Sequence, residues 1–271
     1  MEKEKIENNS GKTIAVVYSF LDLLKHNNSK EEIIYGILKE IPYLDSCGYG
    51  GYITKEGLRE CLDRLIFSSK DKIEFNVEDV KKVVSGIRIS LKRCSVVLKR
   101  DVLKIFIFPN FDSFVKTKMF GNAGFTPWKN TINLYVNSIQ EDKISYTIAH
   151  EIAHALSPYP LKEDNSIGAT LLYEGIAEKF REFFLGGNKA PWTQAISIKK
   201  ANEILQKLNL EKRDYQLYKD LFFGSENYPM WSGYTIGYKM AEKYLERIGK
   251  KNWSKIVRKD MEKESCKLKF N

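Results

Sequence analysis

Apolar residues recur with helical spacing over most of the chain, and two short stretches break this pattern. Before residue 100, apolar positions return every three or four residues, which predicts helices. The segments with this spacing are Thr13–Lys25, Lys30–Ile41, Thr54–Phe67 and Val77–Val97. Asn76 stands directly before the last of them, and we expect its side chain to cap that helix.

The break in the helical pattern predicts a small sheet. Asp101–Pro109 and Thr131–Val136 are rich in β-branched and aromatic residues and are expected to be strands. Phe120–Asn130, between them, is rich in turn residues and is expected to be a loop. Helical spacing then returns in Ile139–Leu156, Ser166–Leu185, Thr193–Leu208, Asp214–Phe222, Ser232–Ile248 and Trp253–Lys263. The pattern predicts an α+β fold with a helical N-terminal part, a small mixed sheet and a helical C-terminal half.

Composition is that of an ordinary globular protein, with 43% hydrophobic and 29% charged residues in a chain of 271. No apolar run approaches the roughly 20 residues that span a bilayer. The apolar stretch Thr13–Leu24 follows several glutamates and contains Asp22, so we do not interpret it as a signal peptide. The four cysteines are widely spaced without a CxxC pair, which is typical of reduced thiols. We therefore expect a cytoplasmic protein without a membrane span.

The net charge of +9 raises the possibility of an acidic partner. The lysines, however, are spread along the chain and mixed with glutamates. The densest basic segment, Lys250–Lys259, fits a solvated helix face better than a binding patch. No nucleic-acid-binding motif accompanies it, and we expect no nucleic-acid partner.

Residues 150–154 read HEIAH within a predicted helix. Histidines four residues apart lie on one helix face, so His150 and His154 can bind one metal ion, with Glu151 placed as general base. Two of the three histidines of the chain fall in this motif. An apolar stripe on another face of the helix would pack into the core, and it consists of Ile144, Ile148, Ile152 and Ala155.

A catalytic zinc ion usually has three protein ligands and one open position. His26 is too isolated in the sequence to be the natural third ligand, which leaves a downstream carboxylate. Glu174 lies 20 residues after His154 on the next predicted helix and is our candidate. Glu178, one turn later, is expected to hydrogen-bond a ligand histidine, with His150 preferred.

Two acidic residues of the intervening loop, Glu163 and Asp164, are alternative ligands of lower rank. The longer metzincin pattern is excluded, because Ser157 and Pro160 occupy the positions where that pattern needs a glycine and a third histidine.

HEIAH followed by YEGIAE at this separation resembles the gluzincin metallopeptidases. The segments FGNAGFTPWKNTINLYV and LFFGSENYPMWSGYTIGYKMAEKYL are similar to those of a mostly bacterial family of predicted zinc-dependent proteases with a C-terminal GYxxGY signature. The resemblance covers about Val102 to Leu245. It implies a zincin-like metallopeptidase domain over residues 101–271, preceded by a helical region of unknown role over residues 1–100.

The resemblance also implies how a substrate would bind. Gluzincins add the peptide to an edge strand, and Thr131–Val136 is the expected edge, with Asn133 and Tyr135 as contacts and Gly121–Thr126 at the rim. The alternative is that Thr131–Val136 is a central strand of the sheet. An oxyanion donor is also required, and Tyr234 is preferred over Tyr238, which is expected to contact substrate. The alternative is that both tyrosines belong to an apolar helix stripe in the core.

The function that these residues predict is hydrolysis of peptide bonds in a peptide or protein substrate by a zinc-activated water. One alternative is a non-catalytic or regulatory zinc-binding protein whose helical N-terminal part binds a partner. Another is a basic binding module in which HEIAH is accidental. An intact general base at Glu151 favours the enzyme, because a structural zinc site has no use for it.

Overall fold

The structure is a computed structural model that describes residues 2–21, 29–41, 54–67, 74–98, 101–158, 165–249 and 252–268. The chain forms two compact units, Met1–Ala155 and Leu156–Asn271. The predicted α+β class is confirmed. Within the first unit, strand β2 (Thr13–Ser19) from before residue 100 pairs with strand β3 (Leu103–Pro109) after it. The division at residue 100 that the family resemblance implies stays a prediction.

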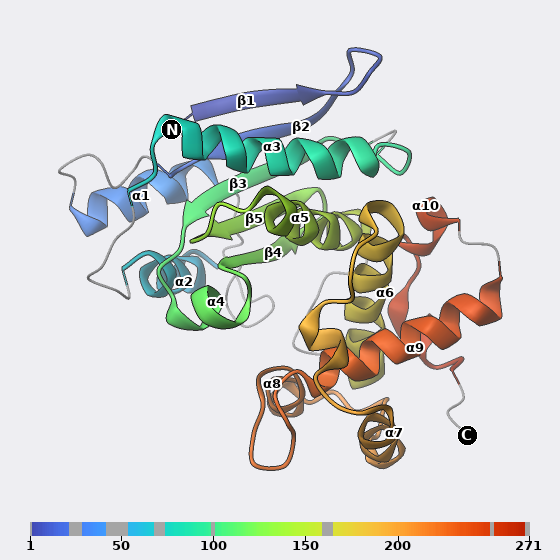
Figure 1. The fold of residues 1–271 in the computed structure, drawn as a ribbon. Helices are drawn as coiled ribbons and strands as arrows, with labels where there is room; N and C mark the ends of the chain where they lie inside the picture. Colours follow the sequence, from blue (N-terminus) through green and yellow to red (C-terminus); the bar gives the residue numbers. More distant parts are fainter. Residues whose placement is uncertain are drawn as a thin grey trace. The chain divides into compact units, whose positions relative to one another are not determined.

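A mixed five-stranded sheet forms the centre of the first unit, in the order β1-β2-β3-β5-β4 (Figure 1). The inner strands β2, β3 and β5 are parallel to one another. The outer strands β1 and β4 are each antiparallel to their neighbour. The strands are β1 Glu2–Glu7, β2 Thr13–Ser19, β3 Leu103–Pro109, β4 Asn122–Trp128 and β5 Thr131–Val136.

Two predictions of local structure are wrong. Thr13–Lys25 was expected to be a helix, but its first seven residues form β2, and residues 22–28 lie outside the described ranges. Ile14, Val16 and Val17 favour a strand once β1 and β3 are there to pair with it. Phe120–Asn130 was expected to be a loop, but most of it forms β4, because pairing with β5 overrides its turn-rich composition.

Helices cover both faces of this sheet (Figure 1). On one face, α1 (Lys30–Glu40) and α2 (Lys55–Phe67) share a hydrophobic cluster with Phe106, Phe108 and Tyr135. The other face carries α3 (Val77–Arg93) and α5 (Glu141–Leu156), while the short α4 (Ser113–Lys118) contacts β4. All these helices except α4 were predicted, and Asn76 caps α3 in a capping box, as expected.

The second unit is helical. Its longest helices, α6 (Ile167–Leu185) and α9 (Ser232–Ile248), pack against each other where Gly175 meets Gly237. Two predicted helices are interrupted, because Ser197 caps α7 and Asp260 caps α11 within them. The remaining elements are η3 Pro191–Gln194, α7 Ile198–Lys207, α8 Tyr215–Phe223, α10 Trp253–Ile256 and α11 Met261–Ser265.

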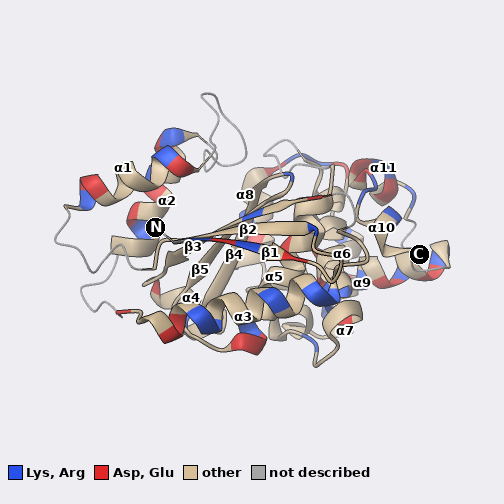
Figure 2. Cartoon of the chain, turned by 90° about the horizontal axis from the view of Figure 1, so that it is seen from above, with Lys and Arg blue, Asp and Glu red and all other residues tan. Residues whose placement is uncertain are grey.

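The basic residues do not form one block along the described chain. Lysine and arginine positions occur on many elements and alternate with acidic ones, as on α1 and α3 (Figure 2). Within the described ranges, no helix has both the length and the apolar composition needed to cross a membrane.

Candidate metal site and its surroundings

Helix α5 carries the HEIAH motif, and its burial pattern follows the expected stripe. Ile144, Ile148 and Ile152 are fully buried, as the sequence predicted. Glu141 and Asp142 stand in the first turn, where negative charge is favourable at the positive end of the helix dipole. The packing of this stripe fixes the rotation of the helix about its axis, and with it the direction of the motif residues.

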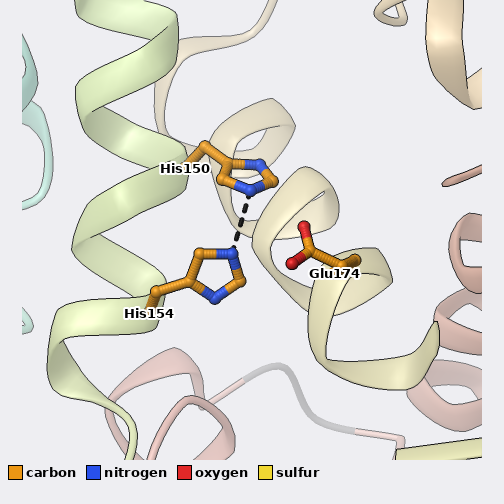
Figure 3. Close-up of side chains that lie close together, drawn as sticks. All are labelled: His150, His154 and Glu174. Atoms are coloured by element: carbon orange, nitrogen blue, oxygen red, sulfur yellow. Dashed lines mark hydrogen bonds between the residues drawn. The ribbon is translucent and has the colours of Figure 1, made fainter. Parts of the chain in front are cut away.

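The two motif histidines meet on another face of α5. Nε2 of His150 lies 2.9 Å from Nε2 of His154, and the rings are nearly perpendicular (Figure 3). His154 is buried and His150 is half-buried. The spacing of four residues therefore brings the same ring nitrogen of both histidines to one point, as a shared ligand requires.

Glu174 completes a group that can hold a metal ion. Ser166 caps the start of α6, and Glu174 lies in the middle of that helix, only 7% exposed. His150, His154 and Glu174 each offer one ligand atom, and these atoms all lie within 4.8 Å of one another. The Glu174 carboxylate is turned toward the imidazoles (Figure 3).

This donor set suits zinc. Ligand atoms about 2.0–2.2 Å from a tetrahedral zinc ion lie about 3.3 Å apart. In this group the two imidazole nitrogens lie 2.9 Å apart, and all three ligand atoms lie within 4.8 Å of one another. Two imidazoles and one carboxylate are also the protein ligands of many catalytic zinc sites. The alternative ligands Glu163 and Asp164, like His26, lie outside the described residues.

Glu151, the predicted general base, is 5% exposed and is hydrogen-bonded to the neighbouring strand. The hydroxyl of Thr126 in β4 lies 2.7 Å from Oε2 of Glu151. A buried carboxylate needs such a donor, because without one its desolvation is costly. Sequence reasoning placed Thr126 at the rim of the site but missed this contact, since the two residues are 25 positions apart.

Glu178 is almost fully buried and accepts two hydrogen bonds within the second unit. One comes from Nε of Arg181, at 3.1 Å, and the other from Nε1 of Trp192, at 2.8 Å. The bond from Glu178 to His150 stays a prediction. Sequence reasoning missed both donors, although Arg181 follows Glu178 at a spacing that puts the two on one helix face.

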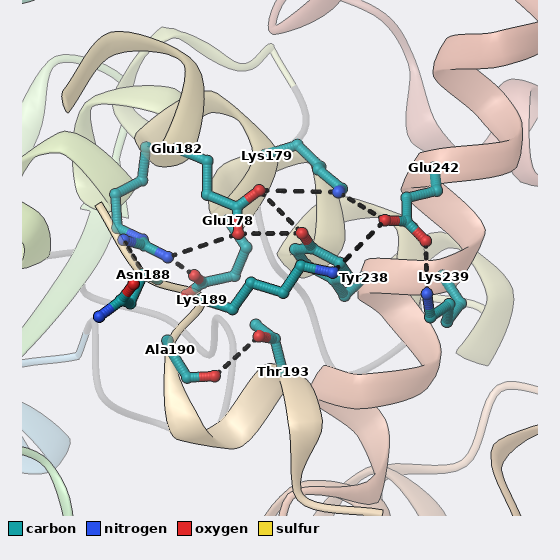
Figure 4. A network of polar contacts seen from close by, with 11 residues as sticks. Glu178, Lys179, Glu182, Asn188, Lys189, Ala190, Thr193, Tyr238, Lys239 and Glu242 are labelled. Carbon is teal, nitrogen blue, oxygen red and sulfur yellow. Dashed lines mark hydrogen bonds and ion pairs between the residues drawn. The ribbon is translucent and has the colours of Figure 1, made fainter. Parts of the chain in front are cut away.

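The substrate contact of Tyr238 stays a prediction, and the surroundings of this residue favour packing. Its side chain is 1% exposed, and its hydroxyl donates to Glu182 at 2.8 Å (Figure 4). Burial raises the pKa of Tyr238 well above its ordinary value, and the bond to Glu182 raises that pKa further. Nζ of Lys179 lies 3.6 Å from the ring centroid and is hydrogen-bonded to Glu242.

Tyr234, the preferred oxyanion donor, is half-buried on α9. Its ring lies edge-on to Phe222 at 4.8 Å between centroids, and 6.3 Å from the ring of Trp192. The proposed oxyanion role of Tyr234 stays a prediction.

The prediction that Thr131–Val136 is the edge strand is wrong. That segment, β5, lies between β3 and β4, and β4 is last in the sheet. Asn133 and Tyr135 are buried, and the Tyr135 hydroxyl lies 3.9 Å from Sγ of Cys61. Burial raises the pKa of Tyr135 well above its ordinary value. Substrate contacts by Asn133 and Tyr135 stay predictions, and the burial of both residues favours a place in the core. The mostly apolar TINLYV suits a strand covered on both faces.

Comparisons with known proteins agree with the chemistry of this group. A search of curated proteins found no match, and neither did a search of solved structures. A family model described as "Predicted Zn-dependent protease (DUF2268)" matches residues 84–263, which include the two histidines, Glu151 and Glu174. Since the match covers well over half of the 271 residues, the chain belongs to this family of predicted Zn-dependent proteases.

Proposed function

We propose that this protein is a gluzincin-type zinc peptidase that hydrolyses peptide bonds, with His150, His154 and Glu174 as its metal ligands. The observation that carries the proposal is the pairing of this donor set with a buried, hydrogen-bonded Glu151 on the helix of the two histidines. Membership of a family of predicted Zn-dependent proteases supports the same chemistry.

In this proposal each side chain has a distinct task. A zinc ion, when bound, supplies Lewis-acid chemistry that polarises a carbonyl and lowers the pKa of a water molecule. Glu151 takes a proton from the attacking water at Oε1 and then delivers it to the leaving amine. Tyr234 donates a hydrogen bond to the developing oxyanion. Glu178 keeps the orienting role expected of it, toward His150.

We propose β4 as the strand that receives the substrate. An extended peptide can add to the end of a sheet through main-chain hydrogen bonds, and β4 ends the described sheet. Its residue Thr126 already contacts Glu151, so a peptide paired with β4 would run beside the general base. The expected substrate is therefore a peptide or protein segment in extended conformation.

We also propose a cytoplasmic location, on the ground that Cys61 and Cys94 are free and buried as reduced thiols. The buffers for the tests below should therefore keep these thiols reduced. The reductant should have no affinity for zinc, so that it does not compete for the metal.

The first test is metal content by mass spectrometry of untagged protein after reconstitution with zinc. We expect stoichiometric zinc in the wild type and a loss or strong weakening of binding in His154→Ala and Glu174→Ala. Glu203→Ala, which changes an exposed glutamate of α7, is the control and should bind zinc normally. Wild-type protein that takes up no zinc would contradict the proposal.

The second test is cleavage of a pool of quenched fluorescent peptides. Glu151→Gln should keep its zinc and lose activity by orders of magnitude, because it can no longer accept the proton. If zinc binds as expected and the wild type cleaves no peptide or protein, the regulatory zinc protein becomes the better description.

A further inference from the structure

Two residues of β4 face the general base. Ala123 and Phe125 of this strand pack against the cluster that α1 and α2 share. Since side chains alternate along a strand, Gly124 and Thr126 point to the opposite face, where α5 lies. Both of them contact Glu151 there.

Thr126 fixes one oxygen of the Glu151 carboxylate. The distance of 2.7 Å from its hydroxyl oxygen to Oε2 is typical of an O–H···O hydrogen bond. The same hydroxyl lies 3.3 Å from the backbone carbonyl oxygen of Glu151, so it contacts both ends of the residue. Threonine is branched at Cβ and has few side-chain rotamers, which keeps the hydroxyl in this direction.

Gly124 provides the room that the carboxylate occupies. A methyl group added there would lie 2.6 Å from Oε1 of Glu151 and would overlap its Cγ. The backbone of Gly124 does not have the positive φ that favours glycine, unlike that of Gly121 nearby. The need for glycine at position 124 therefore comes from space and not from backbone conformation.

We infer that Thr126 and Gly124 are positioning residues for the general base. Thr126 holds Oε2 and thereby turns Oε1 toward the reacting water, and Gly124 leaves the volume in which the carboxylate sits. The catalytic part of this inference rests on the proposed peptidase function. The coupling between Thr126 and Glu151 does not, and it can be measured in the metal-free protein.

The catalytic test compares Thr126→Val, which keeps the shape and removes the hydroxyl, with Thr126→Ser, which keeps the hydroxyl. With one quenched fluorescent peptide selected from the pool, we expect Thr126→Val to lower kcat by about tenfold to 10²-fold, the cost of a misplaced catalytic group. KM and zinc content should change little, because neither the ligands nor the substrate contacts are altered. Thr126→Ser should restore most of kcat, and Gly124→Ala should behave like Thr126→Val. Wild-type kcat in Thr126→Val would overturn the inference.

The second readout is a double-mutant cycle on the urea unfolding midpoint of the metal-free protein. Thr126→Val should shift the midpoint in the wild type and shift it much less in a Glu151→Ala background, because its partner is gone. Equal shifts of the urea midpoint in both backgrounds would show that Thr126 and Glu151 are not coupled and would overturn the inference. If the cycle shows coupling and zinc-loaded wild type cleaves nothing, the catalytic part of the inference and the proposed function fall together, and only the contact stands.

Discussion

Gly175 of α6 lies so close to α9 that an added methyl group would overlap the carbonyl oxygen of Gly237. The same group would lie 2.9 Å from the backbone nitrogen of Tyr238, so backbone surrounds it and no side chain can rotate away. In Gly175→Ala the two helices must separate by about 1 Å, and overpacking of this kind costs about 1–3 kcal/mol. The higher helix propensity of alanine relative to glycine offsets about 0.5–1 kcal/mol of this cost. We expect a net loss of about 1 kcal/mol in the free energy of unfolding.

Urea unfolding measures this loss, and Gly36→Ala is the matched control. Gly36 also lies inside a helix, α1, but nothing stands within 4 Å of the position of an added methyl group. The control should therefore gain about 0.5–1 kcal/mol from helix propensity alone. Gly175→Ala should also bind zinc more weakly in competition with a chromophoric chelator, because the residue directly follows Glu174, the proposed third ligand.

A Gly175→Ala protein that is stabilised as much as Gly36→Ala would refute the reasoning. It would mean that α6 and α9 have room for a methyl group between them, and that the two glycines do not set their separation. Unchanged zinc affinity together with the expected loss of stability would refute only the link between this contact and Glu174.

Two further predictions concern the buried polar groups of the second unit. Arg181→Met should lower the free energy of unfolding in urea by about 3–5 kcal/mol, because it removes the charged partner of the buried Glu178. Lys200→Met removes one member of an exposed ion pair and should change the free energy of unfolding little. Similar losses in the two variants would contradict the argument. Tyr238 has its pKa raised above 10, so its contribution to stability is complete below that pH and is lost as the pH rises above it. Between about pH 9 and 11, the free energy of unfolding of Tyr238→Phe should therefore fall less than that of the wild type, as measured by urea unfolding at each pH. If both proteins lose stability equally with rising pH, the raised pKa of Tyr238 does not contribute.

The helices were predictable where signals along the chain agree with one another. The segments that became α5 and α6 have long apolar periodicity, and Ser166 caps the second of them. The strands were less predictable, because strand formation depends on partners that are distant in sequence. Ile14 and Val17 fit either state locally, and pairing with β1 and β3 decides for a strand.

The candidate site also has a part that the sequence predicts and a part that depends on distant strand partners. The proximity of His150 and His154 was predictable because a helix brings side chains four residues apart together. Glu174 required only the further assumption that the next helix supplies the third ligand. The contacts of Thr126 and Gly124 were not predicted, because they depend on β4, a stretch interpreted as a loop. The same error explains why β5 was taken for the edge strand.

These missed contacts bear on the choice between an enzyme and a structural zinc protein. A structural site uses its ligands and has no need for an ordered carboxylate beside them. In this chain Glu151 is buried, Thr126 donates to it, and a glycine leaves room for it on the adjacent strand. Burying a carboxylate is costly, and a hydroxyl donor offsets that cost only in part, so the arrangement needs a reason other than stability. The proposed proton transfer by Glu151 would supply that reason, and the variants at positions 124 and 126 test this role more directly than variants of the proposed ligands, which would disable a structural site equally.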